Sequence, residues 1–367
     1  MLLVAEKGVR GKGRQPFAPP QRCRDPERIG APAQPKAPLN TTAESSRIGG
    51  RNQQMRSLVL IWALALSATA QPPNLRLPDE STGIDGIAQT LISVFDQADI
   101  VGLGEAHGRR ADSDLRIALV RHPDFAKKVR SIVVEFGSTT EQSTLDRYIR
   151  GENVTRAQLE RVWKTTSNGV WDSPIYADFF AAVRDVNSKL PADARIRVFG
   201  GDPGPTDQRD REAAAFAVIE EQILSKCGKA LVIYGAAHFY RNAPASFGTS
   251  AELAKMLEKA HPGRVYAVIP IGGELDPPPP SVSLRNPDYR KFESALKTQV
   301  RPVLIPLQRP PFRDFAAEEF LGGGFFSCAG PGGCRSAFAG SLLTLGQMAD
   351  ACIYLGDVGK SAKPGAQ

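Results

Sequence analysis

The apolar residues of this chain follow two patterns between positions 84 and 271, and their alternation predicts the order of helices and strands. Over residues 84–95 and 112–121 the apolar side chains recur every three to four positions, which is the period of an amphipathic helix. Short, continuous apolar runs, typical of strands that are buried on both faces, lie between the helical segments. These runs cover residues 100–103, 131–135, 195–199, 230–234 and 264–269. Buried strands joined by helices predict an α/β fold, with a mostly parallel sheet flanked by helices.

Residues 139–190 interrupt this alternation, because their spacing is helical throughout. Within them, Thr155 has the side chain of a helix N-cap, and Pro174 suits the first turn of a helix. We expect a helical insertion here, standing over the carboxyl edge of the strands. Helices are predicted over residues 144–150, 155–164, 174–190, 210–226 and 250–260. The large aromatic residues of the insertion are expected to pack in its core: Trp163, Trp171 and Tyr176.

Beyond residue 271 the pattern weakens. Two more strands are expected, over residues 301–307 and 350–356, and the Gly-rich stretch 322–333 predicts loops. We therefore predict a single α/β domain over residues 71–367. Its core covers about 84–270, and C-terminal strands and Gly-rich loops occupy 271–367.

The first 70 residues differ from the rest of the chain. Residues 1–54 are rich in Arg, Gly and Pro without apolar periodicity, which indicates a leader that is either disordered or not translated. From Met55 to Ala70 a positively charged start, an apolar stretch and an Ala-x-Ala site are typical of a secretory signal peptide. We expect a mature protein that begins near Gln71, is secreted or periplasmic, and has no membrane anchor after cleavage.

Charge and cysteine usage narrow the possible partners. Residues 1–70 hold 11 Lys/Arg and 4 Asp/Glu, which is the whole formal charge of +7, so residues 71–367 are neutral with 35 of each. A neutral body gives no electrostatic reason to expect a nucleic acid partner, and we expect a small-molecule or peptide substrate. The oligomeric state is open. Cys328 and Cys334 bracket a flexible turn, and in an oxidising compartment they are either disulfide-bonded or free.

The sequence Gly-x-x-His occurs twice, each time directly after a predicted strand. The first copy ends in His107 and the second in His238, although the chain contains only four histidines. In open α/β sheets, ligands bind outside the carboxyl ends of the strands. We therefore expect both imidazoles at one edge of the sheet, where they can bind a metal or act as general bases.

Carboxylates accompany the two histidines. Glu105 lies inside the first motif, Glu135 closes an otherwise apolar strand, and Asp202 follows another strand. An unpaired buried carboxylate is costly, so Glu135 is expected to meet a cation, a histidine or a metal.

Each candidate also has a purely structural explanation. His107 can simply cap the following helix, and His238 can be a satisfied histidine at a strand end. Asp202, which precedes a proline, can be a turn residue. Glu135 can pair with Arg109 or Arg241 without any chemical role. Because each residue alone carries little information, the functional hypothesis depends on the four strand ends meeting.

These motifs resemble the superfamily that unites erythromycin esterases, ChaN-type haem-binding proteins and the Tiki/TraB proteins. The resemblance covers about residues 84–270 and includes 104–107, Glu135 and 235–238, while 145–151 is similar to a stretch of the esterase branch. Esterases imply His-assisted attack of water on a lactone. Tiki proteins imply a metal-dependent peptidase, and ChaN-type proteins imply haem binding.

The spacing within the first motif departs from the esterases. Only Ala106 separates Glu105 from His107, which is one residue fewer than in esterases and is ChaN-like. The haem branch implies an exposed iron ligand, for which Tyr240 is the candidate. The branch is therefore open, although the stretch 145–151 favours hydrolysis that needs no metal.

The first hypothesis is an exported hydrolase that acts on an ester, lactone or peptide bond. Its water is activated either by a metal that two histidines and a carboxylate hold, or by an imidazole that a glutamate holds, and the second, esterase-like route requires no cofactor. Its expected catalytic residues are His107, His238, Glu105 and Glu135. The alternative is a non-catalytic protein that binds haem or a divalent metal at the same edge. Its expected metal ligands are these four residues together with Asp202.

Overall fold

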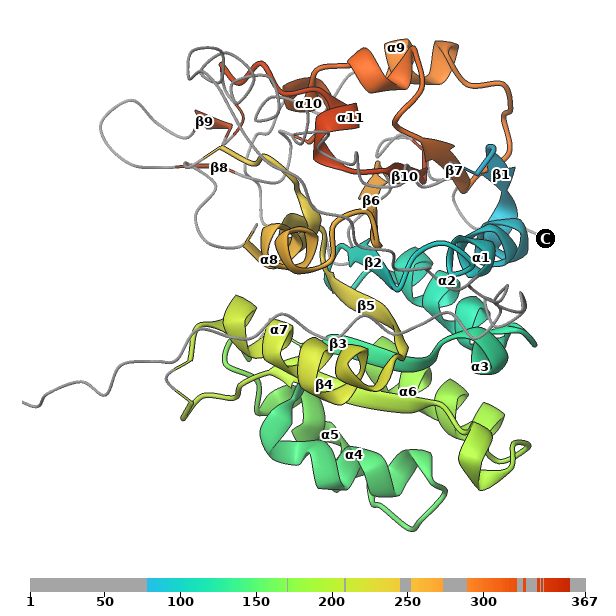
Figure 1. Cartoon of the computed structure of the whole chain (residues 1–367), viewed down its shortest axis with the longest axis vertical. Coiled ribbons are helices and arrows are strands. Elements are labelled where there is room, and N and C mark those ends of the chain that lie inside the picture. Colours follow the sequence, from blue (N-terminus) through green and yellow to red (C-terminus); the bar gives the residue numbers. More distant parts are fainter. Residues whose placement is uncertain are drawn as a thin grey trace, which may run out of the picture. The chain divides into compact units, whose positions relative to one another are not determined.

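The computed structural model describes residues 78–356, except 170, 208, 245–251, 273–288, 322–325, 328–334, 337 and 339. The described residues belong to one compact unit, in which helices cover both faces of a central sheet (Figure 1). The predicted leader, the predicted signal peptide and the Cys328–Cys334 turn lie outside the described residues.

Eight strands form the central sheet in the order β1-β7-β10-β6-β2-β5-β3-β4. From β10 to β4 every neighbouring pair is parallel, and the antiparallel pairs β7–β10 and β1–β7 lie at the other end. The strands are β1 Ser81–Thr82, β2 Ile100–Glu105, β3 Arg130–Ser138, β4 Arg197–Asp202, β5 Lys229–Gly235, β6 Val265–Ile271, β7 Val303–Pro306 and β10 Ala351–Tyr354. A separate pair consists of β8 Phe326–Ser327 and β9 Arg335–Ser336. The predicted α/β class with a mostly parallel sheet is confirmed.

Two apolar clusters fill the spaces between the sheet and its helices. One cluster joins the sheet to the helices that precede β4 in the chain, and these include the predicted insertion. They are α1 Gly83–Val94, α2 Arg110–Arg121, α3 Phe125–Lys128, η2 Thr139–Glu141, α4 Gln142–Ile149, α5 Arg156–Lys164 and α6 Pro174–Asn187.

The second cluster covers the opposite face with the later helices. They are α7 Arg211–Gln222, α8 Glu252–Ala260, α9 Arg290–Ser294, α10 Ala317–Leu321 and α11 Leu345–Met348, with the short turns η4 Leu224–Lys226, η5 Ala236–Phe239 and η8 Phe312–Asp314. The short turn η3 Ala192–Ala194 leads into β4. None of the helices in the described ranges is long and apolar enough to cross a bilayer.

The sequence pattern located most of these elements, with one difference at the site. Strand β3 continues to Ser138, with a register irregularity after Val134, so Glu135 lies inside the strand and not at its end. Side chains alternate between the two faces of a strand. Since Val134 and Phe136 belong to the first cluster and Val133 to the second, Glu135 faces the α7 side of the sheet.

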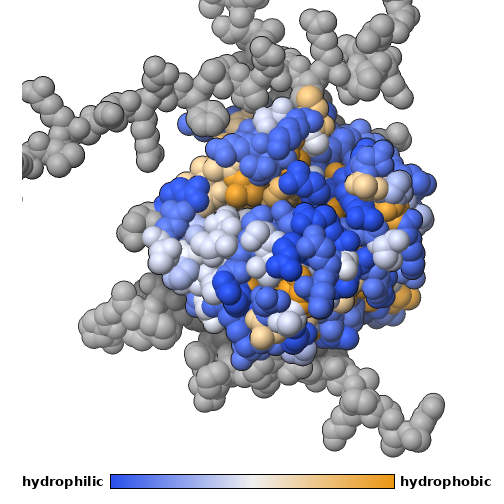
Figure 2. Space-filling model, turned by 90° about the horizontal axis from the view of Figure 1, so that it is seen from below, coloured by the Kyte–Doolittle hydropathy of each residue, from blue (hydrophilic) through white to orange (hydrophobic). Residues whose placement is uncertain are grey.

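The surface of the described residues is mostly polar. On the face that includes α4 and α5, apolar residues form only small patches (Figure 2). Among the described residues, the exposed large hydrophobic side chains are Val300 and Leu342.

Candidate active site

The four strand ends that the sequence singled out are neighbours in the sheet. Strands β2, β5, β3 and β4 are adjacent and parallel, so their carboxyl ends share one edge. Glu105 at the end of β2 is in register with Gly235 at the end of β5. The expected convergence of the two Gly-x-x-His motifs is therefore present in the structure.

The imidazole of His107 lies directly over Gly235. A Cβ atom at position 235 would lie 2.8 Å from His107 Cε1 and 3.1 Å from His107 Nε2. Gly235 has an ordinary φ of −50°, so the glycine is required by the close approach of the imidazole and not by its backbone angles. The side chain of His107 is 41% exposed, and its Nδ1 lies 3.4 Å from Glu105 Oε1.

Glu135 is buried beside this imidazole and is held by three donors. Its Oε1 accepts from Arg211 Nη2 at 2.7 Å and lies 3.1 Å from His238 Nε2, and its Oε2 accepts from the backbone N–H of Gly235 at 2.7 Å. Burial alone would raise the pKa of Glu135, but the charge and hydrogen bond of His238 and the charge of His107 lower it to about 2. Glu135 is therefore ionised at neutral pH.

His238 lies between two glutamates on the α7 side of the sheet. Its Nε2 faces Glu135, and its Nδ1 lies 2.5 Å from Glu212 Oε1. Burial alone would lower the pKa of His238, but these two carboxylates raise it to about 9. His238 is thus a buried imidazolium with both nitrogens engaged. Both ring nitrogens of a protonated imidazole carry hydrogens, so in this state His238 has no lone pair for a proton or a metal. Its expected role as a second base or ligand stays a prediction.

Glu105 lies on the opposite face of the sheet, toward α2 and α6. Its Oε2 pairs with the guanidinium of Arg116, which is fully buried and packs over the rings of Phe136 and Tyr176. Burial alone would lower the pKa of His107, but the hydrogen bond to Glu105 and the charges of Glu135 and Glu105 raise it above 6.5. His107 therefore stands at the strand ends between two carboxylates that face opposite sides of the sheet.

Asp202 is at this edge but has no free oxygen to offer a metal. Its Oδ1 accepts from the N–H groups of Ser167 and Gly204, and its Oδ2 accepts from Ser167 Oγ and Arg211 Nε. The turn interpretation of Asp202 is the one that this geometry supports.

Neither of the two cations named in the structural explanation of Glu135 is its partner in the structure. Arg109 pairs with Asp112, and Arg241 pairs with Asp350. The actual partner, Arg211, is the first residue of α7 and bridges Glu135 and Asp202. The sequence did contain a signal for it, because the N-cap Asp210 places the next residue at the start of a helix, beside the strand ends.

The structure offers little for the metal and haem alternatives. Among the described residues, no group of three or more His, Cys, Asp and Glu side chains is arranged to hold a metal ion. The carboxylates at the edge are already paired with Arg116, Arg211 and His238. Tyr240 is buried in the core, so it does not fit the role of an exposed iron ligand.

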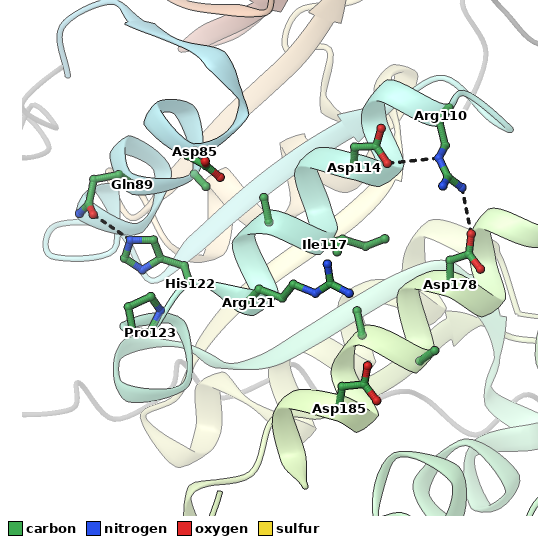
Figure 3. A pocket seen from close by; sticks show the side chains of 14 residues that line it. Asp85, Gln89, Arg110, Asp114, Ile117, Arg121, His122, Pro123, Asp178 and Asp185 are labelled. Atoms are coloured by element: carbon green, nitrogen blue, oxygen red, sulfur yellow. Dashed lines mark hydrogen bonds and ion pairs between the residues drawn. The ribbon is translucent and has the colours of Figure 1, made fainter. Parts of the chain in front are cut away.

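A groove of about 880 Å³ lies elsewhere, between α1, α2 and α6 (Figure 3). Its polar side chains are largely paired with each other: Arg110 bridges Asp114 and Asp178, and His122 Nε2 lies 2.8 Å from Gln89 Oε1. None of the predicted site residues lines this groove, so the candidate chemistry remains at the carboxyl edge of the sheet.

Comparisons with known proteins point to the same superfamily. A family described as haem-binding uptake, Tiki superfamily, ChaN matches residues 91–194, which include the first motif, Glu135 and most of the insertion. No curated protein matches the sequence.

Among solved structures, an erythromycin esterase variant, EreC, in its open conformation has a TM-score of 0.50 at 11% identity, covering 77% of this chain and 98% of that chain. A protein from Bacillus cereus has a TM-score of 0.47 at 13% identity, covering 74% and 91%. ChaN of Campylobacter jejuni, described with cofacial heme binding, has a TM-score of 0.32 at 15% identity, covering 51% and 87%.

The likeness to the esterase shows a shared fold, and the family match adds the motif-bearing segment. Over residues 91–194 the chain is similar to the ChaN family of the Tiki superfamily, which agrees with the resemblance of its motifs. Its fold is similar to that of the erythromycin esterase.

Proposed function

We propose that this protein is a hydrolase in which His107 removes a proton from the water that attacks an ester, lactone or peptide carbonyl. The observation that carries this proposal is the contrast between the two motif histidines. His107 is 41% exposed with only Nδ1 engaged, whereas His238 is buried and engaged at both nitrogens. One imidazole at this edge is thus available to a substrate.

The carboxylates give His107 the properties of a general base. When Nδ1–H donates to Glu105, the lone pair is on Nε2, which is the atom that lies over Gly235. Transfer of a proton from water to Nε2 creates an imidazolium, and the negative charge of Glu135 stabilises it. The hydroxide oxygen bonds to the carbonyl carbon, and the imidazolium then returns its proton to the departing oxygen or nitrogen.

The surrounding ion pairs serve this base indirectly. Arg116 holds Glu105 in place, while Arg211 and His238 hold Glu135. Because these cations already neutralise the carboxylates, a metal would have to displace them. This supports hydrolysis that needs no metal.

The test is a screen of ester, lactone and peptide substrates with wild-type protein, His107→Asn and a control variant. General base catalysis typically contributes about 10²–10⁴-fold, so His107→Asn should lose activity by that factor. His122→Asn, which removes an imidazole from the separate groove, should retain it. Activity should also survive exhaustive chelation.

Two outcomes would overturn the proposal. One is activity that disappears on chelation and returns with a single divalent metal. The other is an inactive protein that binds haemin with a Soret shift lost in His107→Asn.

We also propose that the protein is exported and that its mature form begins near Gln71, because residues 55–70 have the pattern of a signal peptide. Mass spectrometry of the protein recovered outside the cytoplasm should give an N-terminus there. Recovery with residues 1–54 attached would contradict this proposal.

A further inference from the structure

Residues 165–169 and 171–173, the described part of the connection between α5 and α6, include an anchor at the carboxyl edge of the sheet. Ser167 donates two hydrogen bonds of 2.7 Å to the carboxylate of Asp202, one from its backbone N–H and one from Oγ. Asp202 is fully buried at the end of β4 and is itself fixed by Arg211 and Gly204. This segment of the insertion is therefore attached to the same residues that surround Glu135.

The same connection brings Trp171 against the imidazole of His107. The two rings are 4.3 Å apart between centroids and meet edge to face at 76°. On its other sides the indole packs against Tyr176 at 5.6 Å and Phe136 at 6.2 Å. Trp171 is 1% exposed, so it is a rigid part of the core and not a mobile surface side chain.

His107 has few other restraints. Its contact with Glu105 is long, at 3.4 Å, and nearly half of its side chain faces solvent. Gly235 packs against one side of the imidazole, but without a side chain it makes only a backbone contact with the ring. A general base must be held within a narrow range of orientations to act on a bound substrate. Trp171 is the large rigid group that restricts this ring.

We propose that Trp171 is a positioning residue that holds the His107 imidazole over Gly235, and that Asp202 secures it by anchoring the α5–α6 connection. The proposal rests on the proposed function, because it gives the helical insertion the role of orienting the proposed general base, His107. It also gives a role to Asp202 that requires no metal.

The experiment compares Trp171→Ala, Trp171→Phe and wild-type protein by NMR of the histidine Cε1–H groups and by steady-state kinetics. An aromatic ring at this distance shifts the His107 resonance, so Trp171→Ala should move that resonance and lower kcat about tenfold or more, with a smaller change in KM. Trp171→Phe keeps an aromatic ring beside the imidazole, so its His107 resonance and its kcat should both be close to those of the wild type.

The matched control is Trp163→Phe, since Trp163 is equally buried but stacks on Phe180, away from His107. It should leave the His107 resonance unchanged. The anchor is tested by Ser167→Ala, which should shift the His107 resonance and reduce kcat a few-fold. Ser188→Ala, which removes a hydroxyl bonded to a backbone carbonyl on α6, should do neither.

A His107 resonance in Trp171→Ala that coincides with that of wild type would overturn the positioning role. So would an equal shift in Trp163→Phe. If Trp171→Ala turns over substrate with the kcat of the wild type, the positioning role fails while the hydrolase proposal stands. If no variant, wild type included, turns over any substrate, the hydrolase proposal fails.

Discussion

At the residue scale, the candidate site depends on one missing side chain. A Cβ atom at position 235 would lie only 2.8 Å from the edge of the His107 ring, which is too close. The N–H of Gly235 also donates to Glu135. The second Gly-x-x-His motif therefore provides the floor for the histidine of the first. The contact is possible because the two motifs end neighbouring strands that are in register.

Gly235→Ala should displace His107 without unfolding the protein. The added methyl would lie 2.8 Å from Cε1, and the half-exposed imidazole can relieve the clash by rotating toward solvent. We expect activity to fall about 10-fold to 100-fold and the free energy of unfolding to change by about 1 kcal/mol. Gly86→Ala, where a Cβ meets nothing within 4 Å, is the control and should leave activity unchanged.

The pH dependence of activity should report the environment of His107. Only the neutral imidazole can accept a proton, and Glu105 and Glu135 raise its pKa above 6.5, so kcat/KM should fall as the pH drops through that raised pKa. Glu105→Gln removes a carboxylate that raises the pKa, so the acid limb of the profile should move to lower pH. An acid limb that stays in place in Glu105→Gln would contradict this assignment.

At the element scale, the start of α7 completes the site. Asp210 caps the helix by accepting from the N–H groups of Glu212 and Ala213. The next residue, Arg211, reaches Glu135 and Asp202, and Glu212 reaches His238. A single helix start thus supplies a cation to Glu135 and an anion to His238.

Replacing Arg211 should destabilise the fold far more than replacing its neighbour Arg209. Arg211→Met leaves the buried carboxylate of Glu135 without its guanidinium, and breaking such a pair costs about 3–5 kcal/mol in fully buried cases. Because Arg211 is 28% exposed, we expect about 2–3 kcal/mol, measured by urea unfolding at pH 7. Arg209→Met, in an exposed pair with Asp207, should cost less than about 1 kcal/mol. Equal costs would refute the structural role of the Arg211 pair.

At the scale of the whole molecule, stability and charge at the site are linked. His238 has a pKa raised from 6.5 to about 9, so its contribution is complete below pH 6.5 and is lost as the pH rises toward 9. Glu135 has a pKa lowered from 4.5 to about 2, so its contribution is complete above pH 4.5 and is lost as the pH falls toward 2. Both contributions are present together between about pH 4.5 and 6.5.

The free energy of unfolding should therefore decline between pH 6.5 and 9, by a few kcal/mol on the scale of about 1.4 kcal/mol per pKa unit. His238→Gln should be less stable overall, because two buried carboxylates lose their cation, and this alkaline decline should be absent from it. His122→Gln should keep the wild-type slope. Denaturant unfolding measured across this pH range tests the prediction. If the free energy of unfolding of His238→Gln declines with pH as in the wild type, His238 is not the group responsible.

The sequence by itself determined the sheet class, the helical insertion and the two motifs that meet. Apolar periodicity and strand-end motifs are local features, and the rule that parallel strands present their carboxyl ends at one edge converts them into a shared site. For this reason the sequence alone singled out His107, Glu105 and Glu135 as candidates.

Only the tertiary structure decided what each group can do. The extension of β3 turned Glu135 toward α7, where Arg211 and His238 lie, while Glu105 faced α2 on the other side. Both Gly-x-x-His copies look alike in sequence, yet two glutamates raise the pKa of the buried His238, while His107 remains an exposed imidazole. Protonation and access depend on neighbours that lie far apart along the chain, and spacing alone cannot specify them.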